Sequence, residues 1–444
     1  MLKRKEWIEL SPVYFIVLIL IMLIVLFTGI PVAFGLGAVS VITALMIWGS
    51  PGLMMVANSA YSTFTTDNYL AIPMFLMMAS LLQKSGMADD LYEMMYKWMG
   101  SLKGGLAMGT IIICAIFGAM SGGSGPATIS MGLIALPSML SRGYNKHLAV
   151  GSVAAGGILG IIIPPSIPMI ILSGFSTGLS VGKLFTAGIL PGILCATIYI
   201  IYIAIVCRIK PELGPPVPAD DRATWQEKFR LLWALVAPLL LIVLVLGSIY
   251  SGAATPTEAA GIGAMGTLVI TILKRKLTAR VLSDALSRTL SLTAMILWIL
   301  IGAGTFNTIY NYMGAATIMG DIADSLPGGR YSVLLIIMLI NFLLGMLMDD
   351  YAIITLTAPL YLPIIAMLGF DPLWFAMLFM LNLQMAYLTP PFGFNLFYLK
   401  SIVPADVKLT DIYRGIVPFV LLQILALILV ILFPQIATFL PGRM

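Results

Sequence analysis

Charged residues are scarce in this chain. Only 10% of its 444 residues are Asp, Glu, Lys or Arg, whereas 60% are hydrophobic, and the mean hydropathy is +1.05. A soluble domain of this length needs a more polar surface, so the composition predicts an all-α polytopic membrane protein whose main solvent is the lipid bilayer. The formal net charge of +5 is typical of membrane topology and gives no support to nucleic-acid binding.

Histidine and cysteine are also rare, which excludes several kinds of site. The chain has one histidine, His147, and its three cysteines lie in apolar segments without CxxC spacing. Neither a disulfide framework nor a transition-metal site is indicated. The chain has no GxxxxGK[ST] loop, so an ATP-driven pump is disfavoured. A serine protease built from Ser121 and His147 is disfavoured because His147 lies in a polar stretch at the expected membrane edge. We therefore expect no enzyme activity and no organic cofactor.

Long apolar runs are abundant instead. They occur on both sides of a polar stretch at 208–230 in the same number and order, and the basic N-terminus leads into a retained first span because no small-residue cleavage site follows. The runs cover about 14–30, 31–48, 69–85, 104–122, 126–141, 147–174 and 184–207, then 231–250, 256–273, 284–305, 331–348, 351–367, 373–401 and 412–439.

The two sets of runs are related by an internal duplication. A shift of 226 residues aligns turn-forming residues in both sets, because 137 + 226 = 363 and 143 + 226 = 369. The residues that it superposes are Gly35 on Gly261, Gly37 on Gly263, Pro137 on Pro363, Gly143 on Gly369, Pro164 on Pro390 and Pro165 on Pro391. This agreement indicates two repeats, 1–207 and 231–444, joined by a cytoplasmic loop at 208–230.

Each repeat contains two short apolar runs joined by a tight polar link, "SGGSGP" in the first repeat and "MDDY" in the second. We predict re-entrant helical hairpins there, at about 104–141 and 331–367. Each repeat then crosses the membrane five times, and an odd number inverts the second repeat relative to the first. With the N-terminus outside, 18 of the 24 Lys and Arg residues fall in cytoplasmic loops. The positive-inside rule favours this topology, although the N-terminal "KRK" opposes it.

Double prolines interrupt the runs that follow the hairpins, at about 147–174 and 373–401. Each pair should unwind a helix at membrane depth, where irregular backbone survives only if it is buried in protein or lines a polar cavity. Half-helix N-termini would attract an anion there, and free carbonyls would replace water around sodium. The alternative is that the prolines only kink their helices. No lysine or arginine is evident at that depth, so a substrate carboxylate would be held by helix ends, hydroxyls or an amide. The predicted substrate-binding residues are Pro164, Pro165, Ser166, Pro391 and Asn395.

The first hairpin tip, "GAMSGGSGPATISMG", combines glycines with hydroxyl groups. Oxygen ligands of low formal charge suit a weakly held alkali cation that must also leave. Small-residue helix packing is the alternative, but it explains the glycines better than the serines. The tip therefore predicts a sodium site that includes Ser121, Gly122, Ser124 and Thr128.

The second tip carries Asp349 and Asp350 between apolar runs. An unpaired charge in a membrane segment costs roughly 2.5–3.5 kcal/mol, which a bound cation would offset. Two adjacent carboxylates sharing a proton are an alternative, and so is capping of the following helix by one of them. We predict that both aspartates bind sodium together with residues of the second break, namely Thr389, Pro390 and Gly393.

These motifs resemble those of a known family. "GIPVAFGLG", "GAMSGGSGPAT", "RGYNKHLAVGSVAAGGILGIIIPPSIPMII", "ATPTEAAGIGA", "GMLMDD" and "LTPPFGFNLF" are similar to segments of the large membrane subunit of tripartite ATP-independent periplasmic (TRAP) transporters, and the resemblance covers nearly the whole chain. It implies a sodium-driven, elevator-type importer of organic acids in a bacterial or archaeal inner membrane. It also implies two partners, a small four-helix membrane subunit and a periplasmic substrate-binding protein.

Three residues depart from the family pattern. Gly123 replaces a serine, Asp350 adds a second aspartate, and Ala386 stands where glycine is common. The number of sodium ions and their ligands therefore stay open, as do the substrate and the oligomeric state. The competing prediction is a sodium- or proton-coupled carboxylate transporter or exchanger of a related inverted-repeat fold that needs no binding protein. Two amphipathic segments, 85–105 and 307–329, are expected to lie along the interface or to form folded loops.

Overall fold

The computed structural model describes residues 12–176, 178–218, 222–314, 328–405 and 407–444. Every regular element in these ranges is a helix, which confirms the all-α fold class. Six of the described helices are long and apolar enough to cross a membrane, and a bent pair whose two parts meet at 59° is a seventh candidate. The N-terminal "KRK" and most of the predicted amphipathic segment 307–329 lie outside the described residues.

The first half of the chain contains one helix that the apolar runs did not predict. In α3 (Ser50–Phe64), Ser, Asn and Thr interrupt the apolar residues, yet the helix packs on α2 and α14. The predicted amphipathic segment 85–105 forms α5. The other helices are α1 (Pro12–Phe27), α2 (Val32–Trp48), η1 (Asp67–Leu70), α4 (Ala71–Lys84), α5 (Met87–Met99), α6 (Gly105–Ser121), α7 (Ser124–Ser141), α8 (Lys146–Ile158), η2 (Leu159–Ile161), α9 (Ile167–Ser173) and α10 (Val181–Ile209).

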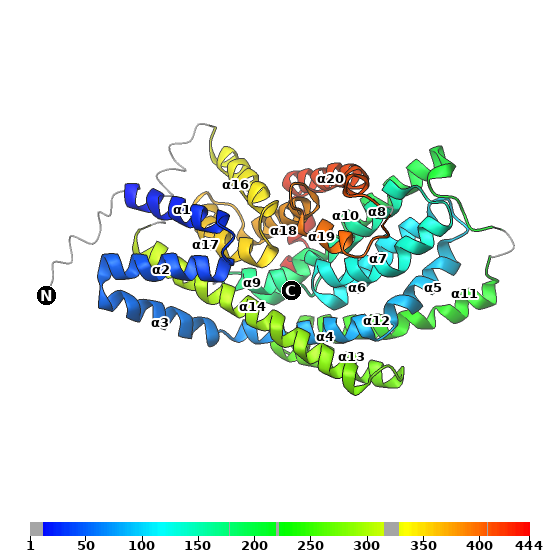
Figure 1. Cartoon of the computed structure of the whole chain (residues 1–444), viewed down its shortest axis with the longest axis horizontal. Helices are drawn as coiled ribbons and strands as arrows, with labels where there is room; N and C mark the ends of the chain where they lie inside the picture. The colour runs from blue at the N-terminus through cyan, green and yellow to red at the C-terminus, as the bar shows by residue number, and fades with distance from the viewer. Residues whose placement is uncertain (1–11, 177, 219–221, 315–327, 406) are drawn as a thin grey trace.

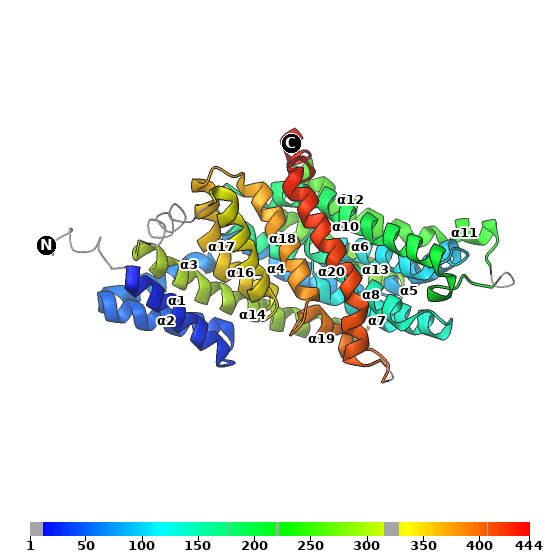
Figure 2. The ribbon, with the colours of Figure 1, turned by 90° about the horizontal axis from the view of Figure 1, so that it is seen from above.

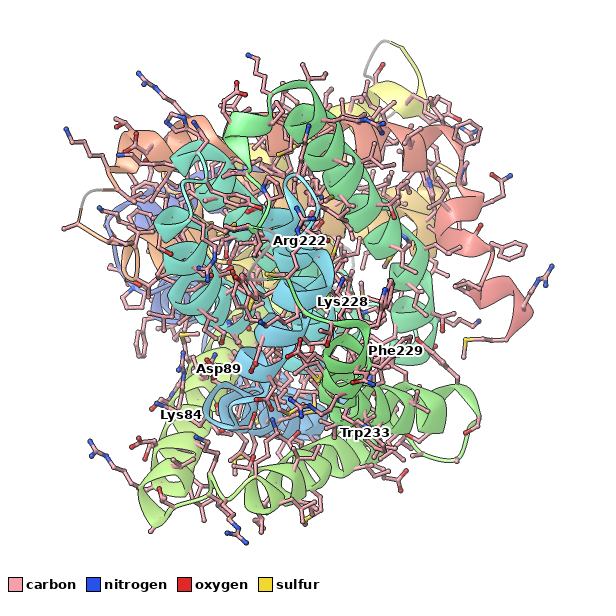
Figure 3. The ribbon with its side chains drawn as sticks, turned by 90° about the vertical axis from the view of Figure 1, so that its right-hand side faces the viewer. Lys84, Asp89, Arg222, Lys228, Phe229 and Trp233 are labelled. Carbon is pink, nitrogen blue, oxygen red and sulfur yellow. The ribbon has the colours of Figure 1, made fainter. Side chains whose placement is uncertain are left out.

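The connecting stretch 208–230 is partly helical. Thr224 and Glu227 form a capping box that starts α11, and the Trp98 indole of α5 donates to the Lys228 carbonyl at 2.8 Å. Figure 3 looks onto this end of the molecule, with Lys228 and Phe229 on α11. The helices of this half are η3 (Pro211–Leu213), α11 (Trp225–Leu231), α12 (Trp233–Tyr250), α13 (Pro256–Leu273), α14 (Ala279–Tyr312), α16 (Arg330–Gly345), α17 (Asp350–Met367), α18 (Pro372–Leu388), α19 (Phe394–Lys400), α20 (Leu409–Leu432), α21 (Gln435–Thr438) and η5 (Pro441–Arg443).

Helix boundaries in the two halves coincide at the offset found in the sequence. Helix α7 begins at Ser124 and α17 at Asp350, and 124 + 226 = 350. The next helices are capped by Asn145 and Asp371, and 145 + 226 = 371. Each capping side chain accepts hydrogen bonds from backbone N–H groups of the first turn. The duplication therefore extends from residue identity to the start points of helices.

The helices form two groups (Figures 1 and 2). In the outer group, α14 packs on α2, α3 and α4, and α13 packs on α4 and α12. In the hairpin group, α8 packs on α6, α7 and α20, while α18 packs on α16, α20 and α10. Figure 1 shows α3, α4, α13 and α14 along one edge, with α16 to α20 above them. The two hairpins and both broken helices thus belong to one group.

Both double prolines interrupt their helices as predicted. In the first, α8 ends at Ile158, a 3-10 turn follows, and α9 begins at Ile167. In the second, α18 ends at Leu388 and α19 begins at Phe394. Both Pro–Pro peptide bonds are cis. The second break ends at Gly393, whose φ of +52° lies in the left-handed region that glycine adopts without a steric cost.

A chain of buried polar groups joins the two halves of the hairpin group. Gln384 Nε2 donates to the Ile158 carbonyl at 2.9 Å, and Gln423 Nε2 donates to Gln384 Oε1 at 2.6 Å. The Tyr199 hydroxyl donates to Gln423 Oε1. All three side chains are buried. These bonds fasten α18 to α8, α10 and α20.

We expect Gln423→Leu to destabilise the protein. It would leave the Tyr199 hydroxyl and the Gln384 amide oxygen buried without these partners, at a cost of about 1–3 kcal/mol for each unsatisfied group. Thermal unfolding of the purified protein in detergent measures the effect as a lower midpoint. The matched control is Gln435→Leu, because Gln435 is exposed. Equal midpoints for the two variants would contradict a structural role for this network.

Candidate ion and substrate site at the hairpin tips

The tip of the first hairpin is a two-residue turn between α6 and α7. Gly122 has φ +67°, and its N–H donates to the Gly118 carbonyl at 3.0 Å. Gly123 is extended, and the Ser121 hydroxyl donates to the Gly123 carbonyl at 3.3 Å. A side chain at position 122 would be strained in the left-handed region, so the glycine follows from the turn itself.

The first tip is docked on the first broken helix. The Ile167 N–H, which opens α9, donates to the Gly122 carbonyl at 2.9 Å. A Cβ added at Gly160 would lie 2.5 Å from the Gly123 carbonyl oxygen, so the two backbones approach without room for a side chain. The Ser166 hydroxyl donates to the Ile161 carbonyl at 2.5 Å inside the break. The hairpin and the break therefore form one unit.

The tip of the second hairpin is acidic. Asp349 caps α17, and its Oδ1 accepts from the Ala352 N–H at 2.9 Å. The capping alternative is therefore confirmed for Asp349. Asp350 is only 6% exposed, and its Oδ1 accepts from the Tyr351 N–H at 3.1 Å. Its own backbone N–H donates to the Tyr387 hydroxyl, which ties this tip to α18.

Both tips face one cavity of about 180 Å³ between the hairpin group and the outer group. Of the predicted site residues, Ser121, Ser124 and Asp350 line this cavity together. The remaining lining residues are Leu76, Ala79, Gly123, Gly125, Pro126, Ile129, Ile167, Arg288, Leu292, Met295, Tyr351 and Tyr398. The cavity therefore combines hydroxyl groups, one carboxylate and one guanidinium with apolar walls.

Thr128 and Asn395 do not line this cavity. The Thr128 hydroxyl donates to Asn395 Oδ1 at 2.6 Å, and Asn395 Nδ2 donates to the Ala154 carbonyl at 2.9 Å. Both side chains are buried. The Asn395 amide is thus engaged at both ends, and it joins α19 of the second repeat to α7 and α8 of the first.

The predicted residues of the double-proline breaks lie apart from the cavity lining. Pro164 and Pro165 are buried beneath the first tip, whereas Pro391 is exposed. The Thr389 hydroxyl donates to the Met385 carbonyl at 2.7 Å, and the Tyr413 hydroxyl donates to the Pro391 carbonyl at 3.3 Å. The first break is therefore buried within the protein, and the second break is exposed at Pro391.

Arg288 is the site residue that the sequence analysis missed. Arg288 is one of the 18 Lys and Arg residues that the sequence predicts on the cytoplasmic side, and the sequence predicts no cation near the site. The structure places it on α14, where it lines the cavity and its Nη1 donates to Gln83 Oε1 at 2.8 Å. One signal was present in the sequence, because Arg288 lies inside the apolar run 284–305 and an ionisable residue there is a functional candidate.

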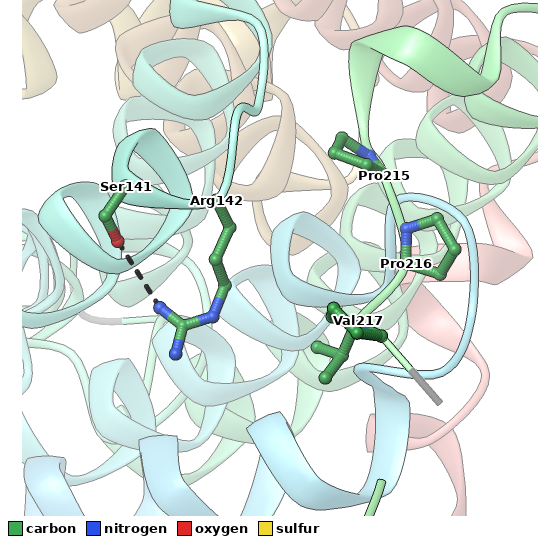
Figure 4. A pocket seen from close by; sticks show the side chains of 6 residues that line it. Ser141, Arg142, Pro215, Pro216 and Val217 are labelled. Atoms are coloured by element: carbon green, nitrogen blue, oxygen red, sulfur yellow. Dashed lines mark hydrogen bonds between the residues drawn. The ribbon is translucent and has the colours of Figure 1, made fainter. Parts of the chain in front are cut away.

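Other hollows are present. One of about 320 Å³ contains Asp349 and the α1–α2 loop, and it adjoins the shared cavity at Met295. Another of about 580 Å³ lies beside the connecting stretch, with Ser141 and Arg142 on one side and prolines on the other (Figure 4), and it contains none of the predicted site residues. His147 does not line the cavity that contains Ser121, and its Nε2 lies 3.4 Å from Asp411 Oδ1.

The fold is that of solved membrane transporters. The YdaH transporter of Alcanivorax borkumensis superposes with a TM-score of 0.64 at 12% identity, over 96% of this chain and 99% of that chain. MtrF of Neisseria gonorrhoeae superposes with a TM-score of 0.61 at 14% identity, over 89% and 85%. Identities this low show the fold alone, and they define the chain as a polytopic protein with a transporter fold.

The sequence then defines the family. Residues 19–436 match the family "Tripartite ATP-independent periplasmic transporter, DctM component". The chain is 31% identical over 401 residues to the C4-dicarboxylate TRAP transporter large permease protein DctM of Pseudomonas aeruginosa, covering 90% of this chain and 92% of that protein. It is 30% identical over 429 residues to the ectoine TRAP transporter large permease protein TeaC of Halomonas elongata, covering 96% and 98%.

A third relative is longer. The isethionate TRAP transporter permease protein DctMQ of Oleidesulfovibrio alaskensis is 30% identical over 419 residues, and the match covers 94% of this chain but 65% of that protein. The chain belongs to the DctM component family, so it is the large membrane subunit of a TRAP transporter, a multi-pass permease and not an enzyme. This confirms the family resemblance. The family works with a periplasmic binding protein and a small membrane subunit.

Proposed function

We propose that this chain carries out sodium-coupled uptake of an organic acid. The observation that carries the proposal is the cavity where both hairpin tips meet, because it places hydroxyl oxygens, a carboxylate and a cationic group at one point between two helix groups. Oxygen ligands suit a hard cation such as sodium, and the guanidinium suits an anionic substrate. Sodium bound first would organise the tips and raise the affinity for the acid, and the acid would raise the affinity for sodium equally.

The sodium ligands come from both tips and from the second break. We assign this role to Ser121, Gly122, Asp349, Asp350, Thr389, Pro390 and Gly393. Ser124, which was predicted as a sodium ligand, lines the same cavity and is assigned to the substrate side. Thr128 acts through Asn395, because its hydroxyl already donates to that amide. Pro164, Pro165, Ser166 and Pro391 shape the substrate side by keeping the helices open. In this scheme Asn395 positions α19 against the first hairpin.

The hairpin group moves as a rigid body against the outer group, in an elevator mechanism. The first hairpin, both broken helices and α18 are joined by hydrogen bonds that a joint movement leaves intact. The repeats 1–207 and 231–444 are inverted relative to each other in a bacterial or archaeal inner membrane. The N-terminus is outside, and 208–230 lies in the cytoplasm. A periplasmic binding protein delivers the substrate, and a small four-helix membrane subunit completes the complex.

Reconstitution tests the function directly. Proteoliposomes with this chain and its small partner subunit are given labelled succinate, isethionate, N-acetylneuraminate or ectoine, compounds of the classes named for its relatives. Each is tested with and without a sodium gradient and the binding protein. We expect uptake of one acid that needs both. Uptake driven by protons, or without the binding protein, would favour the binding-protein-independent transporter and would direct attention to the adjacent Asp349 and Asp350.

A further inference from the structure

Arg288 and Asp350 bring opposite charges to the same cavity from different helix groups. Arg288 belongs to α14 of the outer group, and Asp350 begins α17 of the hairpin group. No ion pair between them is present in the described part of the chain. The Arg288 Nη1 is held by Gln83 of α4, whereas its Nε and Nη2 have no hydrogen-bond partner among the described residues. The guanidinium therefore has donors available at the edge of the cavity.

The first tip offers matching donors across the cavity. Helix α7 begins without a side-chain cap, because its N-cap residue is Gly123, whereas the equivalent Asp349 caps α17. Ser124 is 4% exposed and lines the cavity, and its hydroxyl has no hydrogen-bond partner among the described residues. This hydroxyl can therefore donate a hydrogen bond to a ligand in the cavity. The two tips thus differ. The second tip carries carboxylates, one of which caps α17, whereas the first tip offers hydrogen-bond donors.

We propose that Arg288 binds the carboxylate of the transported acid, together with the Ser124 hydroxyl and the first turn of α7. This rests on the proposed function. A guanidinium recognises a planar carboxylate through two parallel N–H···O bonds, and a helix N-terminus adds positive partial charge. The carboxylate of Asp350 lies on the other tip, where it faces the sodium. A cavity of about 180 Å³ lies below the roughly 300–1,000 Å³ of pockets for drug-sized ligands, so the acid is a small one.

This arrangement gives Arg288 a role that no residue of the hairpin group can have. Ser124 travels with the hairpin group, whereas Arg288 stays with the outer group. Arg288 and Ser124 both bind the acid only when the hairpin group and the outer group have the relative position seen in this structure. Movement of the hairpin group removes the guanidinium from the carboxylate, so Arg288 raises affinity at one end of the movement and not at the other.

The test compares Arg288→Gln with Arg288→Lys and with the matched control Arg280→Gln, which removes an exposed arginine from the same helix. The probe is whichever of labelled succinate, isethionate, N-acetylneuraminate and ectoine the wild type takes up fastest. Equilibrium binding to the purified subunit pair gives Kd, and uptake gives KM. We expect Arg288→Gln to raise Kd at least tenfold, Arg288→Lys to raise it less, and Arg280→Gln to leave it unchanged.

Two further measurements separate recognition from folding. The thermal unfolding midpoint and the sodium affinity measured in the absence of acid should be the same in Arg288→Gln and Arg280→Gln. A Kd equal in these two variants would overturn this inference while leaving the proposed function intact. A wild type that takes up none of the four compounds would overturn the proposed function and this inference with it. Fastest uptake of N-acetylneuraminate would overturn the assignment to a small acid. Fastest uptake of isethionate, which carries a sulfonate and no carboxylate, would overturn the assignment to a carboxylate.

Discussion

Gly160→Ala is expected to reduce uptake by more than tenfold while the protein still reaches the membrane. The added Cβ would lie 2.5 Å from the Gly123 carbonyl oxygen and 3.1 Å from the Gly118 Cα, and both are backbone atoms that cannot rotate away. Overpacking of this kind costs about 1–3 kcal/mol. The first tip would be displaced from the broken helix, and its hydroxyls would leave the cavity. Initial uptake rates in proteoliposomes at matched protein content measure the effect.

The matched control is Gly37→Ala. This glycine also lies within a helix, α2, but a Cβ there meets nothing within 4 Å. Alanine stabilises a helix relative to glycine, so the control should fold at least as well as the wild type. Uptake by Gly160→Ala at the level of Gly37→Ala would show that the close contact between the first tip and the break does not matter for transport.

Asp349→Asn is expected to weaken sodium dependence at least tenfold. Asparagine caps a helix about as well as aspartate, so the hydrogen bond from the Ala352 N–H is kept and α17 should begin at the same residue. The substitution therefore removes the charge and leaves the fold. Uptake measured against sodium concentration at a fixed concentration of acid gives the shift.

Asp350→Asn is the companion variant, because Asp350 is the aspartate that lines the cavity shared by both tips. If both aspartates contribute to cation binding, each variant should raise the sodium concentration for half-maximal uptake. Unchanged sodium dependence in Asp349→Asn would show that this residue is only a cap. Loss of pH dependence in Asp350→Asn without a change in sodium dependence would favour proton coupling instead.

The sequence predicted the large features of the fold because they depend on local chemistry. The all-α class followed from hydropathy, and the breaks followed from prolines that no continuous helix accommodates. The offset of 226 predicted equivalent positions, and the helix starts at Ser124 and Asp350 obey it. These properties are encoded within a few residues of where they act, so reading along the chain is sufficient to find them.

The rest depends on contacts between distant segments. Asn395 was predicted as a substrate ligand because it follows the second break, and its bond to Thr128 spans 267 residues of sequence. Arg288 was predicted to lie on the cytoplasmic side, and only the packing of α14 beside both tips places it in the cavity. Helix α3 was missed because Ser, Asn and Thr interrupt its apolar residues.

The hydrogen bond between Gln384 and Ile158 joins equivalent positions of the two repeats, because 158 + 226 = 384. A residue that contacts its own counterpart lies on the axis that relates the repeats. The donor is the Gln384 side chain and the acceptor is the Ile158 backbone carbonyl, so this contact needs a polar side chain in only one of the two repeats. The equivalent position of the other repeat holds an isoleucine, which packs in the apolar core.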